Sequence, residues 1–295
     1  MIPLAIVAGA VAVAIVLVGA RAVMTGDPDG DFDYDREEQW IVAKSPRWLR
    51  GATRTLDRRT VGGIVVGATF VVVFAVALVV GWIFSGIDDG SGIARWDQSA
   101  AEWGADHATP ASTRVLEVLT DLGGTVYLLV IMALLGIYHG RRYGHWGPAV
   151  HLAVVGVGVS LLNNGLKWII DRDRPEVDQL TGHAGSSFPS GHSAAAAACW
   201  AAIALVAVRH RSATWRRIGA VLAIAIAITV AATRVLLGVH WLSDVVAGVL
   251  VGWAWFTVVT LVFGGRLLRF GLIGEKFVEA GRPRAHEGAP EEVAR

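Results

Sequence analysis

The sequence contains little charge and almost no cysteine. Of its 295 residues, 17% are charged and 54% are hydrophobic, and the mean hydropathy is +0.53. A soluble domain of this length cannot enclose so much apolar surface in one core, so a purely soluble fold is excluded and the chain requires a membrane. The single cysteine, Cys199, excludes an intramolecular disulfide, and a net charge of +1 gives no overall electrostatic preference for a partner.

Apolar runs long enough to cross a bilayer occur seven times. About 20 apolar residues in a helix span a hydrocarbon core of about 30 Å. The candidate spans are residues 2–20, 61–86, 122–138, 147–168, 193–208, 217–236 and 242–264. We therefore expect an all-α fold, a polytopic transmembrane helix bundle with a six-helix core and one additional N-terminal transmembrane helix.

Composition divides the chain into four parts. We interpret them as an N-terminal transmembrane anchor, a cytoplasmic linker that is first acidic and then basic, the six-span core and a partly disordered cytoplasmic tail, at residues 1–24, 25–60, 61–264 and 265–295. The alternative for residues 1–20 is a signal peptide, but no Lys or Arg precedes the apolar run and no clear cleavage site follows it. The basic segment 36–59 is expected to lie along the anionic inner leaflet.

Arginine residues in the short loops predict an orientation. They occur between the third and fourth spans, between the fifth and sixth, and after the seventh, at Arg141, Arg142, Arg209, Arg211, Arg216, Arg217, Arg266 and Arg269. Short loops rich in Lys and Arg face the cytoplasm. The acidic stretch 88–121, the loop 171–191 and the turn at Gly238 are then on the outer face of a multi-pass plasma-membrane protein.

Lys167 and Arg174 lie at the end of the fourth span. Seven residues make nearly two helical turns, so both side chains point the same way if the helix continues to Pro175, where proline ends it. A guanidinium can grip two phosphate oxygens and an ammonium adds a mobile point charge, which together suit a dianion. The alternative is that both cations form ordinary helix-surface ion pairs with Asp171.

The motif Ser190-Gly191-His192 precedes the fifth span. Unpaired backbone amides and the dipole at a helix N-terminus form an anion site, and glycine lets a ligand approach the backbone closely. Ser190 can add a hydroxyl donor. The alternative is an ordinary capped helix in which His192 merely lies at the water boundary.

Arg234, His240 and Asp244 surround the turn between the last two spans. His240 and Asp244 are four residues apart on one helix face, so the carboxylate can accept a proton from one ring nitrogen and leave the other nucleophilic. Arg234 would face elsewhere on an unbroken helix, so we expect a turn at Gly238 that returns it to the site. Alternatively, Asp244 and Ser243 only complement the dipole of the last span.

These three motifs, in this order on successive spans, closely resemble the signature of the type 2 phosphatidic acid phosphatase superfamily over residues 61–264. Thr233 stands where the family usually has serine. The resemblance implies a lipid phosphatase that needs no metal or other cofactor. In it His240 attacks phosphorus and forms a phosphohistidine, Asp244 orients His240, and His192 acts as general acid and then activates water. The groups that would surround the phosphate oxygens are Lys167, Arg174, Ser190, Gly191 and Arg234.

Two other functions fit part of the pattern. A metalloenzyme would need His183, His192, His240 and Asp244 to converge, but their spacing matches no metal motif and the nearby cations would repel a divalent ion. A membrane transporter or lipid-binding protein would use the same cations to hold an anionic head group, although no inverted repeat is evident. As partners we expect membrane lipids, no nucleic acid, and a lipid phosphate substrate such as undecaprenyl diphosphate or another polyprenyl phosphate, phosphatidylglycerol phosphate or phosphatidic acid.

Overall fold

The computed structural model describes residues 58–144, 146–177, 179–182 and 185–267, and within them all regular structure is helical. The α-helices are α4 (Arg58–Asp88), α5 (Asp97–Asp106), α6 (Pro110–Thr120), α7 (Thr125–Tyr143), α8 (Gly147–Ile169), α9 (Gly191–Ala207), α10 (Ala213–Leu236) and α11 (Leu242–Leu267), and the 3-10 helices are η1 (Ala94–Trp96) and η2 (Asp121–Gly123). The predicted all-α fold class is confirmed. The expected N-terminal helix at 2–20, the linker up to residue 57 and the tail beyond 267 lie outside the described residues.

Among the described residues, four helices are long and apolar enough to cross a membrane, over Val66–Asp88, Gly147–Ile169, Ala213–Leu236 and Leu242–Val262. A fifth crossing is formed if α6 with η2 and α7, which meet at a bend of 48°, are taken as one broken span. Helix α9, the remaining predicted span, has 17 residues and is therefore about 26 Å long. The six apolar runs predicted for the core thus correspond to six helices, of which α9 is the shortest.

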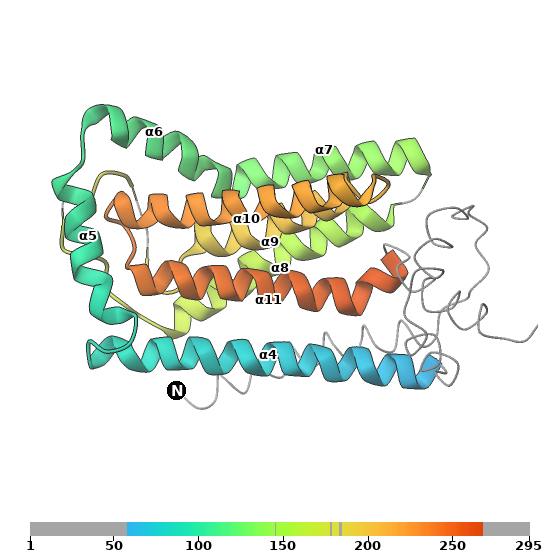
Figure 1. Cartoon of the computed structure of the whole chain (residues 1–295), viewed down its shortest axis with the longest axis horizontal. Coiled ribbons are helices and arrows are strands. Elements are labelled where there is room, and N and C mark those ends of the chain that lie inside the picture. The colour runs from blue at the N-terminus through green and yellow to red at the C-terminus, as the bar shows by residue number, and fades with distance from the viewer. Residues whose placement is uncertain (1–57, 145, 178, 183–184, 268–295) are drawn as a thin grey trace, which may run out of the picture.

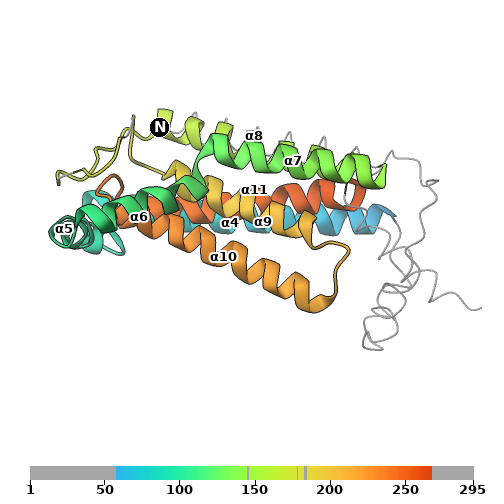
Figure 2. The same cartoon turned by 90° about the horizontal axis from the view of Figure 1, so that it is seen from above.

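Helix α9 occupies the centre of the bundle, where it packs against α8, α10 and α11 (Figures 1 and 2). Its alanine-rich first half is almost completely buried, and small side chains allow neighbouring backbones to approach closely. A Cβ atom added to Gly252 of α11 would lie 2.3 Å from the Ala194 carbonyl oxygen, and one added to Gly248 would lie 2.6 Å from the Ser190 oxygen. Because these glycines have no side chain, the beginning of α11 can lie directly against the beginning of α9.

The outward surfaces of the bundle carry large apolar side chains. Examples on α4, α7, α8 and α10 are Phe70, Phe74, Leu78, Leu134, Leu161, Val221 and Leu222, all more than half exposed. Exposed apolar area of this extent is covered by lipid tails in a membrane protein. Helix α4 is attached to the bundle along one side only, where Ile83 packs with Phe188 and Ala247.

All three predicted motifs lie at one end of the bundle. The end of α8, the start of α9, the end of α10 and the start of α11 come together there, beside α5 (left in Figure 1). Residues 88–121, predicted only as an outer loop, form the short helices α5 and α6. Thr109 caps α6 with a capping box and Pro110 occupies its first turn, which explains where this helix begins. Both helices pack against α10, and α5 also contacts α11.

Candidate active site

The loop between α8 and α9 begins close to residue 168, the predicted end of the fourth span. Helix α8 ends at Ile169, and Ile170 already has extended backbone angles (φ −108°, ψ 95°). The helix does not continue to Pro175, the condition under which Lys167 and Arg174 would share one helix face, and Arg174 belongs to the loop.

Hydrogen bonds between the two ends of this loop explain why α8 ends before Pro175. The amide and hydroxyl of Ser187 donate to the carbonyl oxygens of Arg172 and Asp173, each at 2.9 Å, and the amide of Arg172 donates to Ser186 Oγ at 3.1 Å. A helical conformation would direct these same groups along the helix axis. The backbone groups of Arg172 and Asp173 therefore bond to Ser186 and Ser187 instead of continuing the helix.

Lys167 and Arg174 nevertheless converge, because the loop brings one acceptor to both. The ammonium of Lys167 donates to the Ser186 carbonyl oxygen, and Arg174 Nη2 lies 3.4 Å from the same oxygen. Arg174 Nη1 donates to the Val239 carbonyl at 2.5 Å and lies 3.5 Å from His240 Nε2. Arg174 thus connects the first motif to the third.

The second motif forms the first turn of α9, as predicted. Ser190 is the N-cap residue and is fully buried, but its hydroxyl accepts a hydrogen bond from Ser193 Oγ at 2.9 Å instead of capping a backbone amide. The first amides of a helix have no acceptor within the helix, so this turn presents backbone donors. A Cβ atom at Gly191 would lie 3.1 Å from Asn163 Nδ2 and 4.0 Å from Lys167 Cε, which places this backbone close to the first motif.

The third motif folds back through the turn predicted at Gly238, which has a positive φ of 70°. The amides of Val239 and His240 both donate to the Arg234 carbonyl oxygen, at 3.3 and 3.2 Å. His240 Nδ1 lies 3.4 Å from Asp244 Oδ2, and this oxygen also accepts the Trp241 amide at 3.0 Å. Asp244 therefore has both functions considered from the sequence, since it faces the histidine ring and caps the first turn of α11.

His240 is almost completely enclosed, at 3% exposure. Burial lowers the pKa of His240 to about 4, because a charged ring loses its hydration there. The Asp244 carboxylate raises this pKa and the Arg174 and Arg234 guanidinium groups lower it further. The ring is thus neutral at physiological pH, as a nucleophile has to be.

His192 and Arg234 face the same region from α9 and α10. His192 lies within electrostatic range of Arg234, His240, Lys167 and Arg174. The Arg234 side chain is 4% exposed, and its Nη1 donates to Thr120 Oγ1 at the end of α6 at 3.1 Å. Its Nε is buried and has no hydrogen-bond partner among the described residues. All eight predicted site residues thus lie at this end of the bundle.

Two charged residues beside the site were not identified from the sequence. Arg172 Nη1 donates to Asp244 Oδ1 at 2.5 Å, and Arg172 Nη2 donates to Asp97 Oδ2 at 2.8 Å. Asp97 is the first residue of α5 and is 4% exposed. Arg172 lies inside the spacing of the first motif, but no local pattern distinguishes Asp97 from the other acidic residues of 88–121.

The described residues contain no group of three or more His, Cys, Asp or Glu side chains that could hold a metal ion. His183, which the metalloenzyme alternative requires, lies outside this part of the chain. The positive charges of Lys167, Arg174 and Arg234 surround the two histidines instead. The described residues therefore gather positive charge at this end of the bundle.

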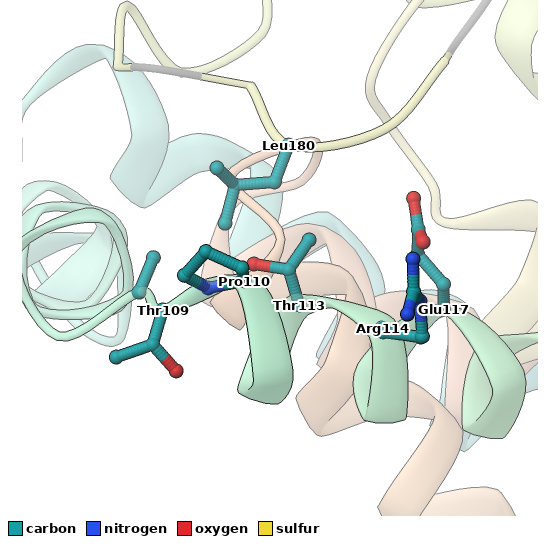
Figure 3. Close-up of a pocket in the computed structure, with 7 residues that line it drawn as sticks. Thr109, Pro110, Thr113, Arg114, Glu117 and Leu180 are labelled. Carbon is teal, nitrogen blue, oxygen red and sulfur yellow. The ribbon is translucent and has the colours of Figure 1, made fainter.

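A groove of about 340 Å³ lies on the surface of the molecule beside α6, at the same end as the site (Figure 3). It is formed by α6 and the preceding turn together with one residue of the α8–α9 loop, and its lining residues are Ala108, Thr109, Pro110, Thr113, Arg114, Glu117 and Leu180. None of the predicted site residues lines it. Leu180 is held there by a hydrogen bond from its amide to the Leu237 carbonyl oxygen at 3.1 Å.

The region of the chain that contains this site is similar to known proteins. The model of the PAP2 superfamily matches residues 148–267. Phosphatidylglycerophosphatase B of Bacillus subtilis (strain 168) is 34% identical over 152 residues, which cover 51% of this chain and 74% of that protein. Lipid A 1-phosphatase of Rhizobium etli is 34% identical over 183 residues, or 53% of this chain and 74% of the relative.

A solved structure agrees with these sequence matches. The crystal structure of a transmembrane PAP2 type phosphatidylglycerolphosphate phosphatase from Bacillus subtilis superposes with a TM-score of 0.60 at 27% sequence identity. The matched region covers 63% of this chain and 93% of that one. The chain belongs to the PAP2 superfamily and is a multi-pass membrane protein.

Proposed function

We propose that this protein is a lipid phosphatase that removes a phosphate group from a membrane lipid through a phosphohistidine formed on His240. The observation that carries the proposal is the environment of that ring. Nδ1 faces the Asp244 carboxylate, which selects the tautomer with the proton on Nδ1, while Nε2 is directed at Arg174. A neutral imidazole nitrogen thus points toward the cation that would hold a phosphate.

Two displacement steps follow from this placement. In the first, the Nε2 lone pair attacks phosphorus, the bond from phosphorus to the leaving oxygen breaks, and His192 donates a proton to that oxygen. In the second, His192 accepts a proton from water, the water oxygen attacks phosphorus, and the P–N bond to His240 breaks. Inorganic phosphate is released, and the neutral His240 ring is restored. These roles require that His192 face the phosphate from α9 and carry a proton when the first step begins.

Positive charge would supply most of the stabilisation of the transition state. Lys167, Arg174 and Arg234 approach from three different elements, and the first-turn amides of α9 at Gly191 and His192 add donors that do not have to reorganise. Burial lowers the pKa of the Arg174 guanidinium, while Asp244 opposes this effect, and arginine keeps its charge at neutral pH. No divalent cation is required, so we expect release to continue in the presence of a chelator.

The substrate is proposed to be a lipid because the site lies at one end of apolar helices. A head group can enter there while its tail remains beside the exposed faces of the bundle. Phosphatidylglycerol phosphate is supported by the names of two relatives, and lipid A by another. A polyprenyl diphosphate and phosphatidic acid share the same chemistry, a terminal phosphate on an apolar anchor.

The site is proposed to face away from the cytoplasm. The arginine-rich connections after α7 and between α9 and α10 lie at the end of the bundle opposite to the site (Figure 1). Exposed tryptophans that suit a lipid–water boundary lie at both ends, Trp82, Trp103 and Trp168 at the site end and Trp146 and Trp215 at the other. This arrangement supports a plasma-membrane location with an outward-facing site.

Phosphate release by the purified protein tests the proposal. The substrates are phosphatidylglycerol phosphate, phosphatidic acid, lipid A and a polyprenyl diphosphate in detergent micelles, each with and without a chelator. We expect release from at least one, insensitive to the chelator, and abolished by His240→Ala. The matched control His107→Ala changes an exposed histidine at the end of α5 and is expected to release phosphate normally. Head-group binding without any release would instead indicate a lipid-binding protein.

A further inference from the structure

A charged network connects α5 to the catalytic pair. Asp97 Oδ2 accepts Arg172 Nη2 at 2.8 Å, and Arg172 Nη1 donates to Asp244 Oδ1 at 2.5 Å. Asp244 Oδ2, its other oxygen, faces His240 Nδ1. The contacts therefore run without interruption from Asp97 through Arg172 and Asp244 to the ring that is proposed to attack phosphorus.

Asp97 also fixes the first turn of α11. Its Oδ1 accepts the Ser243 amide at 2.8 Å and its Oδ2 accepts the Ser243 hydroxyl at 2.6 Å. The Ser243 hydroxyl in turn accepts Arg172 Nη1 at 2.8 Å. A carboxylate from α5 thus satisfies a first-turn donor of the helix that carries Asp244, next to His240.

We infer that Asp97 is a positioning residue for the proposed phosphatase reaction, acting on His240 through Arg172 and Asp244. The inference rests on the proposed function and extends it to a helix outside residues 148–267, the segment matched by the family model. Alone, Arg172 would neutralise the Asp244 carboxylate and weaken its effect on the ring. Because Asp97 pairs with Arg172 as well, the three side chains keep one net negative charge.

Burial makes this arrangement sensitive to the loss of one member. The side-chain exposures of Asp97, Arg172 and Asp244 are 6%, 13% and 0%. Charges so far removed from water interact strongly, and removal of one partner leaves another charge uncompensated. Replacement of the Asp97 carboxylate by an amide would leave the Arg172 charge acting on Asp244 alone.

The variant Asp97→Asn tests the inference by steady-state phosphate release. We expect kcat to fall by about 10- to 100-fold, as misplaced catalytic groups cause, with KM changed far less. Because positive charge then increases near the ring, we also expect the acid limb of the pH profile to move to lower pH. The groups facing His240 are Asp244 on α11, Arg174 on the loop, Arg234 on α10 and His192 on α9, and all are retained.

Further variants distinguish a positioning role of Asp97 in the reaction from a contribution to stability alone. Asp97→Glu keeps the charge and is expected to restore part of kcat, and Asp106→Asn, an exposed carboxylate at the other end of α5, serves as the control with normal release. If Asp97 acts through Arg172, the effects of Asp97→Asn and Arg172→Gln are not additive in the double variant.

The possible outcomes distinguish this inference from the proposed function. Unchanged kcat and pH profile in Asp97→Asn, with His240→Ala inactive, would overturn the positioning role and leave the phosphatase in place. Additive effects of the two variants would also overturn it. Absence of release by the parent protein from every lipid would instead contradict the proposed function. If Asp97→Asn does not fold, the partial rescue by Asp97→Glu and the kcat of Arg172→Gln decide the question.

Discussion

At the scale of the residue, the enclosure of His240 determines the chemistry of the site. A neutral ring held between a carboxylate on one nitrogen and a cation near the other can attack phosphorus without first losing a proton to solvent. The same enclosure lowers the pKa of His240 to about 4. The pH at which activity is lost therefore reports directly on this environment.

The pH profile of the parent protein follows from this pKa. Because the folded pKa lies below the ordinary value for histidine, the ring stays neutral as the pH falls through 6 and is protonated only near pH 4. We expect kcat/KM, measured between pH 3 and 9 on a stable preparation, to keep its acid limb well below about 6.5. An acid limb near the ordinary histidine pKa of about 6.5 would contradict the enclosure of His240.

Thr120 provides a second prediction at this scale. Its hydroxyl accepts Arg234 Nη1, and Arg234 is buried with its Nε already lacking a partner. Thr120→Val removes the acceptor, which costs about 1–3 kcal/mol for a buried polar group left unpaired. We expect a lower unfolding temperature in detergent and weaker binding of a phosphate analogue. Thr113→Val, on the same helix but facing the groove, is the control and should change neither measurement.

At the scale of the element, close contact between α9 and α11 aligns two of the three motifs. The amide of Ser190 donates to the Asp244 carbonyl oxygen at 3.0 Å, so the first turns of the two helices are joined directly. Glycines on α11 permit this approach, because side chains at Gly248 and Gly252 would meet the α9 backbone. The spacing of the site thus depends on residues that never contact a substrate.

Gly252→Ala is expected to separate these helices. Its added Cβ would lie 2.3 Å from the Ala194 carbonyl oxygen, a contact that requires backbone movement. Overpacking of this kind costs about 1–3 kcal/mol, so we expect a reduced unfolding temperature together with reduced phosphate release. Gly165→Ala on α8 has no atom within 4 Å of the added Cβ, and this control should be at least as stable as the parent. Equal behaviour of the two variants would show that the α9–α11 contact does not limit stability.

The sequence predicted those elements that depend on local pattern. Long apolar runs located the core helices, and a glycine between Arg234 and His240 located the turn that brings the third motif together. The course of the loop after α8 was not predicted, because it is set by hydrogen bonds from Arg172 to Ser186 and from Ser187 to Asp173, each between residues 14 positions apart. Asp97 was missed for the same reason, since its partners follow about 75 and 146 residues later.

At the scale of the whole molecule, the bundle has two chemically different ends. One gathers the site and the acidic residues of 88–121, and the other carries the arginine-rich connections. Because short basic loops stay in the cytoplasm, we propose that this asymmetry orients the site outward. A lipid phosphate in the outer leaflet would then be hydrolysed without crossing the membrane.

Labelling of single cysteines in intact cells tests this orientation. Cys199, the native cysteine, is 2% exposed within α9, so the parent is expected to react little. Asp89→Cys introduces an exposed thiol at the site end, and Arg211→Cys introduces one between α9 and α10. A membrane-impermeant maleimide should label Asp89→Cys in intact cells and Arg211→Cys only after the membrane is opened. The reverse pattern would place the site in the cytoplasm.

Isolation of the phosphorylated enzyme tests the central claim most directly. The protein is mixed with a lipid substrate carrying radioactive phosphate, quenched within the first turnover and digested into peptides. We predict an acid-labile, base-stable label, as expected for a phosphohistidine, on the peptide that contains His240 and not in His240→Ala. Label on another residue, or rapid turnover with no labelled protein at any quench time, would contradict the proposed nucleophile.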